Sequence, residues 1–367
     1  MADTGKTSDR YDYMLLIPTL ILIVLGLVIV YSASSNIAAH EYLRPYFYFE
    51  RQFFYCAFGL LMLMIARNIP CTLYARIVYP MLCLSIILLL LLFVPGIGHK
   101  AGGATRWLHI APFSFQPSEV VKFTLAVYMA YSMARKGSDM KYALTGLVPH
   151  LIVVGIFIGL IALQPDFGTC VILGMWLFIM LFVGGARIFH LLLLLVPVLP
   201  LMWLAVMNSD YRLKRWLAFI DPWKDPRGIG YHIIHSFLAF GSGGWFGVGL
   251  GNGKQKLFFL PEPHTDFILS VAGEELGFAG VAIITVLFGI IIIKGIKVAL
   301  DARDIYSTYL SLGLTIMFGL QVIINMGVVM GLLPTKGLTL PLISYGGTSL
   351  VLNMFCIGVL LNISSRS

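Results

Sequence analysis

Charged residues are scarce in this sequence. Only 11% of its 367 residues are Asp, Glu, Lys or Arg, whereas 59% are hydrophobic. An ordinary globular chain carries about 25% charged residues, because polar side chains must cover much of its surface. The shortage excludes a soluble globular protein and indicates a chain that lies mostly within a membrane.

Metal-binding cysteine spacings and the common catalytic motifs are also lacking. The five cysteines show no CxxC pattern, so neither a disulfide framework nor a zinc site is indicated. His232 and His235 lie three residues apart, but no third ligand stands at a zinc spacing. No Walker A, GxSxG, HExxH or dinucleotide-binding pattern occurs in a fitting context. The glycine-rich stretch GSGGWFGVGLGNG follows no Rossmann strand pattern, and we interpret it as a flexible loop.

Long apolar runs dominate the sequence. About 17–25 consecutive apolar residues are enough for a helix to cross a bilayer. The first run is too long for a signal peptide and lacks its cleavage site, so we expect it to remain as an anchor. The sequence therefore predicts an all-α polytopic membrane protein, with a single domain over residues 1–367. About ten spans are expected, near residues 14–35, 52–66, 74–95, 118–134, 145–163, 168–185, 188–207, 267–293, 306–330 and 342–362.

The basic residues predict the orientation of these spans. With ten spans and a cytoplasmic N-terminus, the inner side holds twelve of the 25 basic residues, whereas the short outer loops and their edges hold five. This bias obeys the positive-inside rule, so both termini are expected in the cytoplasm. The net charge of +8 is then mostly a topology signal and gives little support for nucleic-acid binding.

Three outer segments are candidates for a functional surface. Residues 94–116 separate the third and fourth spans, and residues 208–266 separate the seventh and eighth. The longer segment is rich in aromatic and apolar residues, so we expect it to fold back onto the membrane as short helices. The third, LLPTKGLTLPLISYGG, mixes Pro and Gly with apolar residues, and such backbone survives at membrane depth only beside a cavity or under protein. Together they predict a cavity on the outer face.

Two charged residues fall inside the fourth span. Glu119 and Lys122 lie at positions i and i+3 of a helix, which places them on one face as an ion pair. Such a pair can fix helix packing, or it can serve a site, because charges in a span usually face a partner or a watery cavity. Asp166, in a Pro-bounded turn, is expected to act as a turn or helix-cap residue.

The stretch LPEPHTDFILSVAGEELG, residues 260–277, concentrates four carboxylates where a loop meets the eighth span. Its prolines exclude a continuous helix, so the span is expected to begin near Thr265 or Asp266. Asp266 could cap that helix, or it could act as a general base at the mouth of the cavity. Glu274 and Glu275 lie two turns or more further along, on other faces, so the carboxylates cannot form one site. Both glutamates are interpreted as structural support.

Several motifs together resemble a known family. The runs TRWLHIAPFSFQPSE, GIGYHIIHS, GSGGWFGVGLG, KLFFLPEPHTDFILSVAGEELG and PTKGLTLPLISYGGTSLVLN occur in order over nearly the whole chain. They are similar to the SEDS proteins (shape, elongation, division and sporulation), and to the division branch more than the elongation branch. One departure is His232, where a glutamine is usual.

The resemblance implies ten transmembrane helices and an enzyme of the bacterial cytoplasmic (inner) membrane. Such enzymes are peptidoglycan glycosyltransferases, which join lipid II into β-1,4 glycan strands during septal wall synthesis and release undecaprenyl pyrophosphate on the outer face. Lipid II, the nascent glycan strand, a class B penicillin-binding protein and other division proteins are the implied partners.

The resemblance also implies roles for particular residues. The aspartate of the HTDF motif, Asp266, is expected to be essential. Trp107 and the Glu119–Lys122 pair match other functionally important family positions. We assign His264 and Thr265 of HTDF and Ser344 of LPLISYGG to substrate binding.

A leaving pyrophosphate needs positive charge to stabilise it. Residues on the correct side for this role are Arg106, Arg212, Lys214, Arg215 and Lys256, although a single basic residue there could equally contact lipid headgroups. No cofactor is indicated. A divalent cation, Mg²⁺ or Mn²⁺, could share the task, but the sequence shows no clear set of ligands for one.

Three other functions remain open at this point. A lipid II flippase would also use buried charges and a cavity, but it needs polar groups along a path through both leaflets. A scaffold that recruits a transpeptidase would have no use for a carboxylate facing a cavity. An elongation-type polymerase would share the same chemistry.

Overall fold

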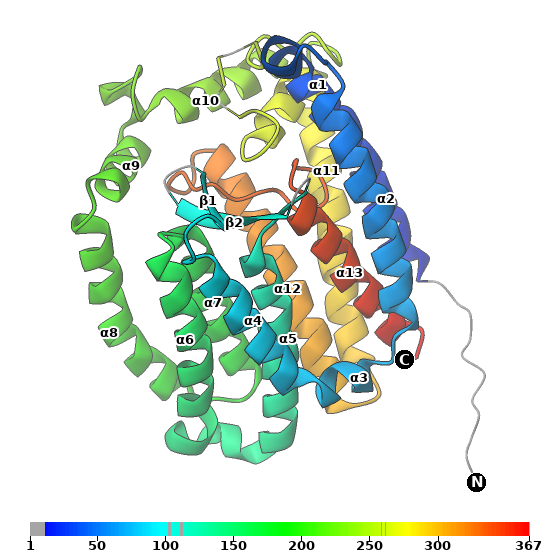
Figure 1. Cartoon of the computed structure of the whole chain (residues 1–367), viewed down its shortest axis with the longest axis vertical. Helices are drawn as coiled ribbons and strands as arrows, with labels where there is room; N and C mark the ends of the chain where they lie inside the picture. The colour runs from blue at the N-terminus through cyan, green and yellow to red at the C-terminus, as the bar shows by residue number, and fades with distance from the viewer. Residues whose placement is uncertain (1–11, 102–103, 111–112, 258, 261, 367) are drawn as a thin grey trace.

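The structure, a computed structural model, describes residues 12–366 except 102–103, 111–112, 258 and 261. Most of this part is helical, and the helices form a bundle (Figure 1). Within the described residues, seven helices are long and apolar enough to cross a membrane. They are α1 (Tyr13–Tyr42), α2 (Phe47–Asn68), Ala143–Leu163, which includes α6 (Val148–Leu163), α8 (Ile188–Met207), α11 (Ile268–Leu300), α12 (Ile305–Val329) and α13 (Gly347–Ser364).

Three further helices match predicted spans but are shorter or more polar. Helices α4 (Val78–Leu91) and α7 (Phe167–Val183) are apolar but have 14 and 17 residues. Helix α5 (Pro117–Lys136) has 20 residues and carries Glu119, Lys122, Arg135 and Lys136. The chain is a multi-pass membrane protein, as predicted, and the count of ten spans stays a prediction.

Two predicted spans differ from the helices that form. The third is broken at Ile77, so α3 (Cys71–Arg76) precedes α4. The tenth was expected from residue 342, but α13 begins only at Gly347. Residues 342–346 remain outside the helix, because Ser344 and its neighbours bond to another loop near α11.

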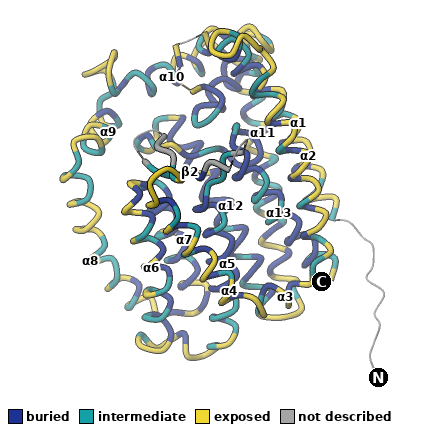
Figure 2. The backbone as a smooth tube through the Cα atoms, in the orientation of Figure 1, coloured by how far each residue is buried: buried dark blue, intermediate teal, exposed yellow. Residues whose placement is uncertain are grey.

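The bundle is organised around α12. This helix packs against α5 and α11 and is mostly buried, whereas α8 lies at the periphery, where Leu191 is its one buried residue (Figure 2). Small residues allow close packing in such bundles. At Gly358 of α13, for example, an added β-carbon would collide with the backbone of Leu63 in α2.

The two ends of the bundle differ in structure. One end carries a small antiparallel sheet, which the all-α prediction did not include; its strands are β1 (Gly98–Ala101), β2 (Ala104–Ile110) and β3 (Phe113–Phe115), in that order. Helices α9 (Asp210–Ile220) and α10 (Tyr231–Gly243) lie at the same end, within the 208–266 segment that was expected to form short helices (Figure 1). At the opposite end, Asp12 pairs with Lys294 at 3.2 Å and accepts from Ser364 at 2.7 Å. The short helical segments Gly137–Lys141, Ala143–Leu147 and Pro222–Lys224 complete the helical part of the described residues.

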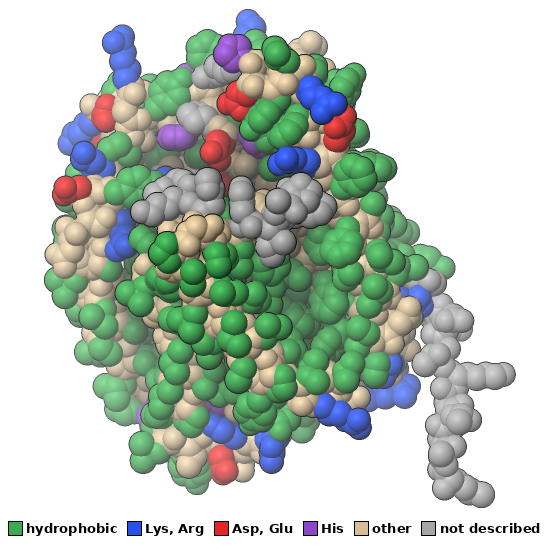
Figure 3. Space-filling model, in the orientation of Figure 1, with side chains coloured by type: hydrophobic (Ala, Val, Ile, Leu, Met, Phe, Trp, Pro, Cys, Tyr) green, Lys and Arg blue, Asp and Glu red, His purple; other side chains and the backbone are tan. Residues whose placement is uncertain are grey.

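The distribution of side chains agrees with this arrangement. Figure 3 shows hydrophobic side chains in a broad band around the middle of the visible face, with Lys, Arg, Asp, Glu and His side chains gathered towards both ends. A band of this kind is what the hydrocarbon core of a bilayer requires.

Candidate active site

Asp266 lies in a turn immediately before α11. The helix begins at Ile268 with Phe267 as its N-cap residue, so Asp266 does not cap it, and the expected start near Thr265 or Asp266 is wrong by two to three residues. The turn closes with a hydrogen bond of 3.1 Å from the Thr265 N–H to the Glu262 carbonyl. Asp266 therefore does not serve as the helix cap, which was the alternative to a catalytic base in the sequence analysis.

Three hydrogen bonds to backbone carbonyls hold this turn in place. The Ser344 hydroxyl donates to Thr265 at 2.6 Å, and the Tyr345 N–H donates to His264 at 2.9 Å. The Asn325 side-chain amide donates to Asp266 itself at 3.1 Å. The loop before α13 and the buried helix α12 thus fix the position of Asp266 from two directions.

Two of the residues in this support were not found from the sequence. Asn325, in α12, is 2% exposed, and its amide also donates to the Leu338 carbonyl. Gln52, in α2, is 1% exposed and donates to the Ser344 carbonyl at 3.2 Å. The available signal was an amide side chain inside a predicted span, which must find a partner within the protein.

Local electrostatics tune the Asp266 carboxyl group. Burial raises its pKa to about 7, and the Glu262 carboxylate adds to the rise, while Arg106 and Arg215 oppose it. Gly337 leaves room beside the carboxyl group, because a β-carbon there would lie 3.0 Å from Asp266 Oδ2 and 3.9 Å from Arg106 Nη1. A carboxyl group with a pKa near neutrality is suited to accept a proton and release it again.

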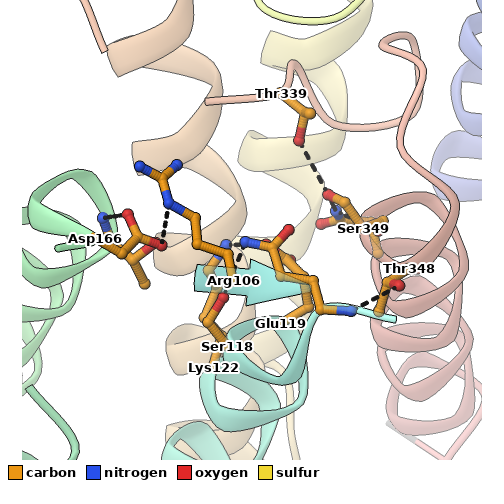
Figure 4. A network of polar contacts seen from close by, with 11 residues as sticks. Arg106, Ser118, Glu119, Lys122, Asp166, Thr339, Thr348 and Ser349 are labelled. Atoms are coloured by element: carbon orange, nitrogen blue, oxygen red, sulfur yellow. Dashed lines mark hydrogen bonds and ion pairs between the residues drawn. The ribbon is translucent and has the colours of Figure 1, made fainter. Parts of the chain in front are cut away.

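Arg106 links the small sheet to the start of α7. Its side chain extends from β2 towards Asp166, with 3.7 Å between Nε and Oδ2 (Figure 4). Asp166 caps α7, because its carboxylate accepts from the N–H and hydroxyl of Thr169 at 3.2 and 2.8 Å. The predicted cap role of Asp166 is confirmed. Trp107, the next residue of β2, is partly buried.

Two predicted cations of α9 approach the same end of the bundle. Arg212 donates to the Ala205 carbonyl at 2.8 Å, and its guanidinium lies 4.9 Å from the ring centroid of Phe167. Arg215 donates to the Thr335 carbonyl at 3.3 Å. Lys214 is exposed. The structure thus brings Arg106 and Arg215 near Asp266 and places Arg212 beside α7.

Two residues assigned to substrate binding are instead occupied inside the protein. The His264 ring is 6% exposed and lies 4.4 and 5.5 Å from the ring centroids of Tyr48 and Tyr345. Burial lowers the pKa of His264 to about 4, so the ring is neutral. The Ser344 hydroxyl, besides donating to Thr265, accepts from the Leu340 N–H at 2.8 Å. We therefore reassign both to positioning the Asp266 turn. Thr265 is partly buried, and its hydroxyl donates to the Glu262 carbonyl at 3.0 Å.

Lys256 also departs from its predicted role. Its ammonium group is 2.6 Å from Glu275 Oε1 and 2.8 Å from the Ser32 hydroxyl, and the side chain is 3% exposed. The ammonium charge is neutralised within this buried pair, so we do not assign Lys256 to binding the pyrophosphate. Glu274 accepts from the N–H groups of Lys254 and Gln255 instead, which confirms that the glutamates and Asp266 do not share one site.

The glycine-rich segment packs against a break in α11 and bonds to the helix on both sides of it. Gly277 breaks the helix with φ +69° and ψ −169°. Across the break, the N–H groups of Val248 and Gly249 donate to the carbonyls of Glu274 and Glu275 at 3.0 and 3.1 Å. On the other side, the N–H groups of residues 278 and 279 donate to the carbonyls of residues 244 and 245 at 2.9 and 3.0 Å. The expectation of a flexible loop is wrong, because these bonds satisfy backbone groups that a broken membrane helix would leave unpaired.

The Glu119–Lys122 pair lies within the bundle. Lys122 Nζ is 2.6 Å from Glu119 Oε1, and both side chains are buried, which confirms the predicted ion pair (Figure 4). The pair lines a cavity of about 30 Å³ together with Gln321 of α12 and Asn353 of α13. Such a volume holds about one water molecule, so the pair faces packed helices and not a cavity of substrate size, which supports a structural role.

The described residues include no group of three His, Cys, Asp or Glu side chains placed to hold a metal ion. Around Asp266, the positive charge comes instead from the Arg106 and Arg215 side chains. The protein side chains therefore do not fit a metal site of their own.

Comparison with known proteins identifies the family. A family model described as "Cell cycle protein", named for FtsW, RodA and SpoVE, matches residues 13–367. The chain belongs to this family. It is 44% identical over 361 residues to a probable peptidoglycan glycosyltransferase FtsW of Geobacter metallireducens, covering 98% of this chain and 96% of the relative.

Solved structures show that the FtsW/RodA/SpoVE fold extends over the whole chain. One solved chain matches with a TM-score of 0.79, 28% identity and 98% coverage of both chains. It comes from work on the structural coordination of polymerization and crosslinking by a peptidoglycan synthase complex. The Thermus thermophilus rod shape determining protein RodA matches with a TM-score of 0.72, 27% identity and 98% coverage of both. The predicted SEDS family and its division branch are confirmed.

Proposed function

We propose that this protein is a peptidoglycan glycosyltransferase that polymerises lipid II into β-1,4 glycan strands during septal wall synthesis. The observation that carries the proposal is the Asp266 carboxyl group, whose turn is held by Ser344, Tyr345 and Asn325 and whose pKa is raised to about 7 beside Arg106 and Arg215. A positioned base next to positive charge is the combination that glycosyl transfer to a weakly nucleophilic hydroxyl requires.

The reaction needs one proton transfer and one displacement. Asp266 accepts the proton of the 4-hydroxyl on the incoming sugar, and that oxygen attacks C1 of the donor sugar. The bond from C1 to the pyrophosphate oxygen breaks, and its electron pair leaves with undecaprenyl pyrophosphate. Inversion at C1 gives the β linkage in a single displacement, so one base is sufficient.

The positive charge near Asp266 supports the departure of the pyrophosphate. Arg106 and Arg215 lie close enough to lower the pKa of the carboxyl group, and guanidinium groups bind phosphate oxygens in two-point contacts. A divalent cation brought with the substrate, bound largely through phosphate oxygens, is compatible with this charge and is part of the proposal.

We place the site on the outer face of the bacterial inner membrane, with both termini in the cytoplasm. The bias of basic residues towards the predicted inner loops supports this orientation. A class B penicillin-binding protein is the proposed partner, since a chain of similar fold comes from work on how a peptidoglycan synthase complex coordinates polymerization and crosslinking. Other division proteins complete the proposed assembly.

The test is a polymerisation assay with purified lipid II and the purified chain together with its cognate class B penicillin-binding protein. That partner should carry an inactive transpeptidase site, so that only glycan polymer forms. We expect long glycan strands and release of undecaprenyl pyrophosphate. A chain that forms no polymer, but moves labelled lipid II across liposome bilayers, would instead be a flippase.

A further inference from the structure

Three consecutive residues before α13 connect the parts of the candidate site. The carbonyl of Thr335 accepts from Arg215 at 3.3 Å. Gly337 faces Asp266 and Arg106. Between them, Lys336 directs its ammonium group over the ring of Phe167, 5.6 Å from the centroid. Lys336 thus lies between two residues that approach cations of β2 and α9.

Two cations contact the Phe167 ring. Arg212 lies 4.9 Å and Lys336 5.6 Å from its centroid, so both cations contact one ring at the start of α7. Asp166 is the neighbouring carboxylate, but it already caps α7 and pairs with Arg106. Within the part of the chain that the structure describes, neither Arg212 nor Lys336 forms an ion pair with a carboxylate.

The charges around the site do not balance. Four cations, Arg106, Arg212, Arg215 and Lys336, stand with three carboxylates, Glu262, Asp166 and Asp266. The excess of positive charge grows when Asp266 is protonated. Partly buried cations without a counter-ion are costly, and an anionic ligand would remove that cost.

We propose that Lys336 is a substrate-binding residue that, with Arg212, holds the diphosphate of the incoming acceptor lipid beside Phe167. This inference rests on the proposed polymerase function. Polymerisation brings two lipid diphosphates to one site, and the donor's diphosphate is attached directly to the reacting C1. The acceptor's diphosphate is separated from its reacting hydroxyl by the rest of a disaccharide.

The positions of the cations fit this division. Arg106 and Arg215 act directly on the Asp266 carboxyl group, which is where the donor diphosphate must lie. Lys336 is influenced instead by Asp166 and Cys170 of α7, and Arg212 stacks on the same helix. Burial lowers the pKa of Lys336 to about 8 although both of these groups raise it, so its ammonium group lacks full compensation until an anion binds.

The first test is steady-state kinetics of Lys336→Gln, with the acceptor lipid II concentration varied. We expect the KM for lipid II to rise about tenfold, which corresponds to about 1.4 kcal/mol. Lys336→Arg, which keeps the charge, should stay within about threefold of the wild type. Lys224→Gln, which removes an exposed lysine of the long loop, is the matched control and should leave KM unchanged. An unchanged KM in Lys336→Gln would overturn the assignment while leaving the polymerase function intact.

The second test needs no turnover and therefore separates this inference from the proposed function. Binding of lipid II in nanodiscs is measured against pH in an Asp266→Asn background. Affinity should fall above about pH 8 as the Lys336 ammonium group loses its proton, and the fall should disappear in Lys336→Arg, because a guanidinium stays charged. This comparison also decides the matter if Lys336→Gln fails to fold. Identical pH profiles in the two proteins would contradict the proposal.

Discussion

The side-chain amide of Asn325 donates a 3.1 Å hydrogen bond to the backbone carbonyl of Asp266. The same amide donates to the carbonyl of Leu338, so one buried side chain of α12 joins the turn before α11 to the loop before α13. The candidate base is thus positioned through its backbone, and its carboxyl group remains available to a substrate.

Asn325→Ala should therefore lower kcat with little change in KM. A displacement of the base by about 1 Å can cost up to about 100-fold in rate, and we expect a loss of about 10- to 100-fold here. The midpoint of the pH dependence of activity should stay the same, because the groups that set the Asp266 pKa are not removed.

The control for Asn325 is Asn362→Ala in α13, a buried asparagine that donates to the Arg67 carbonyl far from the site. It should lose comparable stability and keep kcat. Equal losses of kcat in the two variants would show that Asn325 acts only through general stability.

The pH profile should identify the ionised form of Asp266 as the active one. Its pKa of about 7 means that kcat/KM rises as the pH increases through neutrality, because a base must be unprotonated to accept a proton. Glu262→Gln removes a neighbouring negative charge, so the rise should move to lower pH. Arg106→Gln removes a positive charge and should move it to higher pH. Shifts in the reverse directions would contradict the assignment.

Much of the fold was accessible from the sequence because membrane spans follow from apolar length. The pattern placed most helices within a few residues, and the i, i+3 spacing of Glu119 and Lys122 predicted their contact. The break at Gly277 was not accessible, because a helical pattern continues through it and the compensating bonds come from a segment some thirty residues earlier.

The candidate site was accessible only in part, for a similar reason. Asp266 was singled out because it ends the long outer loop at the start of a span, and the resemblance to the SEDS proteins implied that it is essential. Lys256 was misassigned because its partners, Ser32 and Glu275, are distant in sequence and no local pattern reveals a buried pair. Asn325 and Lys336 were overlooked because their significance depends on which loops the fold brings to α7 and α12.

The Lys256–Glu275 pair should contribute to stability as a unit. Removing one partner of a buried pair costs about 3–5 kcal/mol, because the other charge is left uncompensated. Lys256→Met and Glu275→Gln should each lower the thermal unfolding temperature in detergent, and the double variant should lose clearly less than the two losses combined. Additive losses would show that the two side chains are not coupled.

The contact between the glycine-rich segment and the break in α11 can be tested at two glycines that both have positive φ. Gly247→Ala places a β-carbon against the backbone carbonyl of Glu275, whereas nothing lies within 4 Å of a β-carbon at Gly251. Gly251→Ala should cost only the backbone strain, about 1–2 kcal/mol. Gly247→Ala should cost more and should expose the 268–276 amides to hydrogen exchange. Equal destabilisation of both variants would rule out the close approach at the break.

The central claim is that Asp266 is the catalytic base, and the most direct measurement is glycan polymer formed by Asp266→Asn from purified lipid II. Asp210→Asn, at an exposed aspartate of α9, is the matched control and should polymerise normally. We expect Asp266→Asn to fold, to bind lipid II, and to lose activity by about 100- to 10,000-fold, the usual contribution of a general base. Undiminished polymer from folded Asp266→Asn would contradict the account.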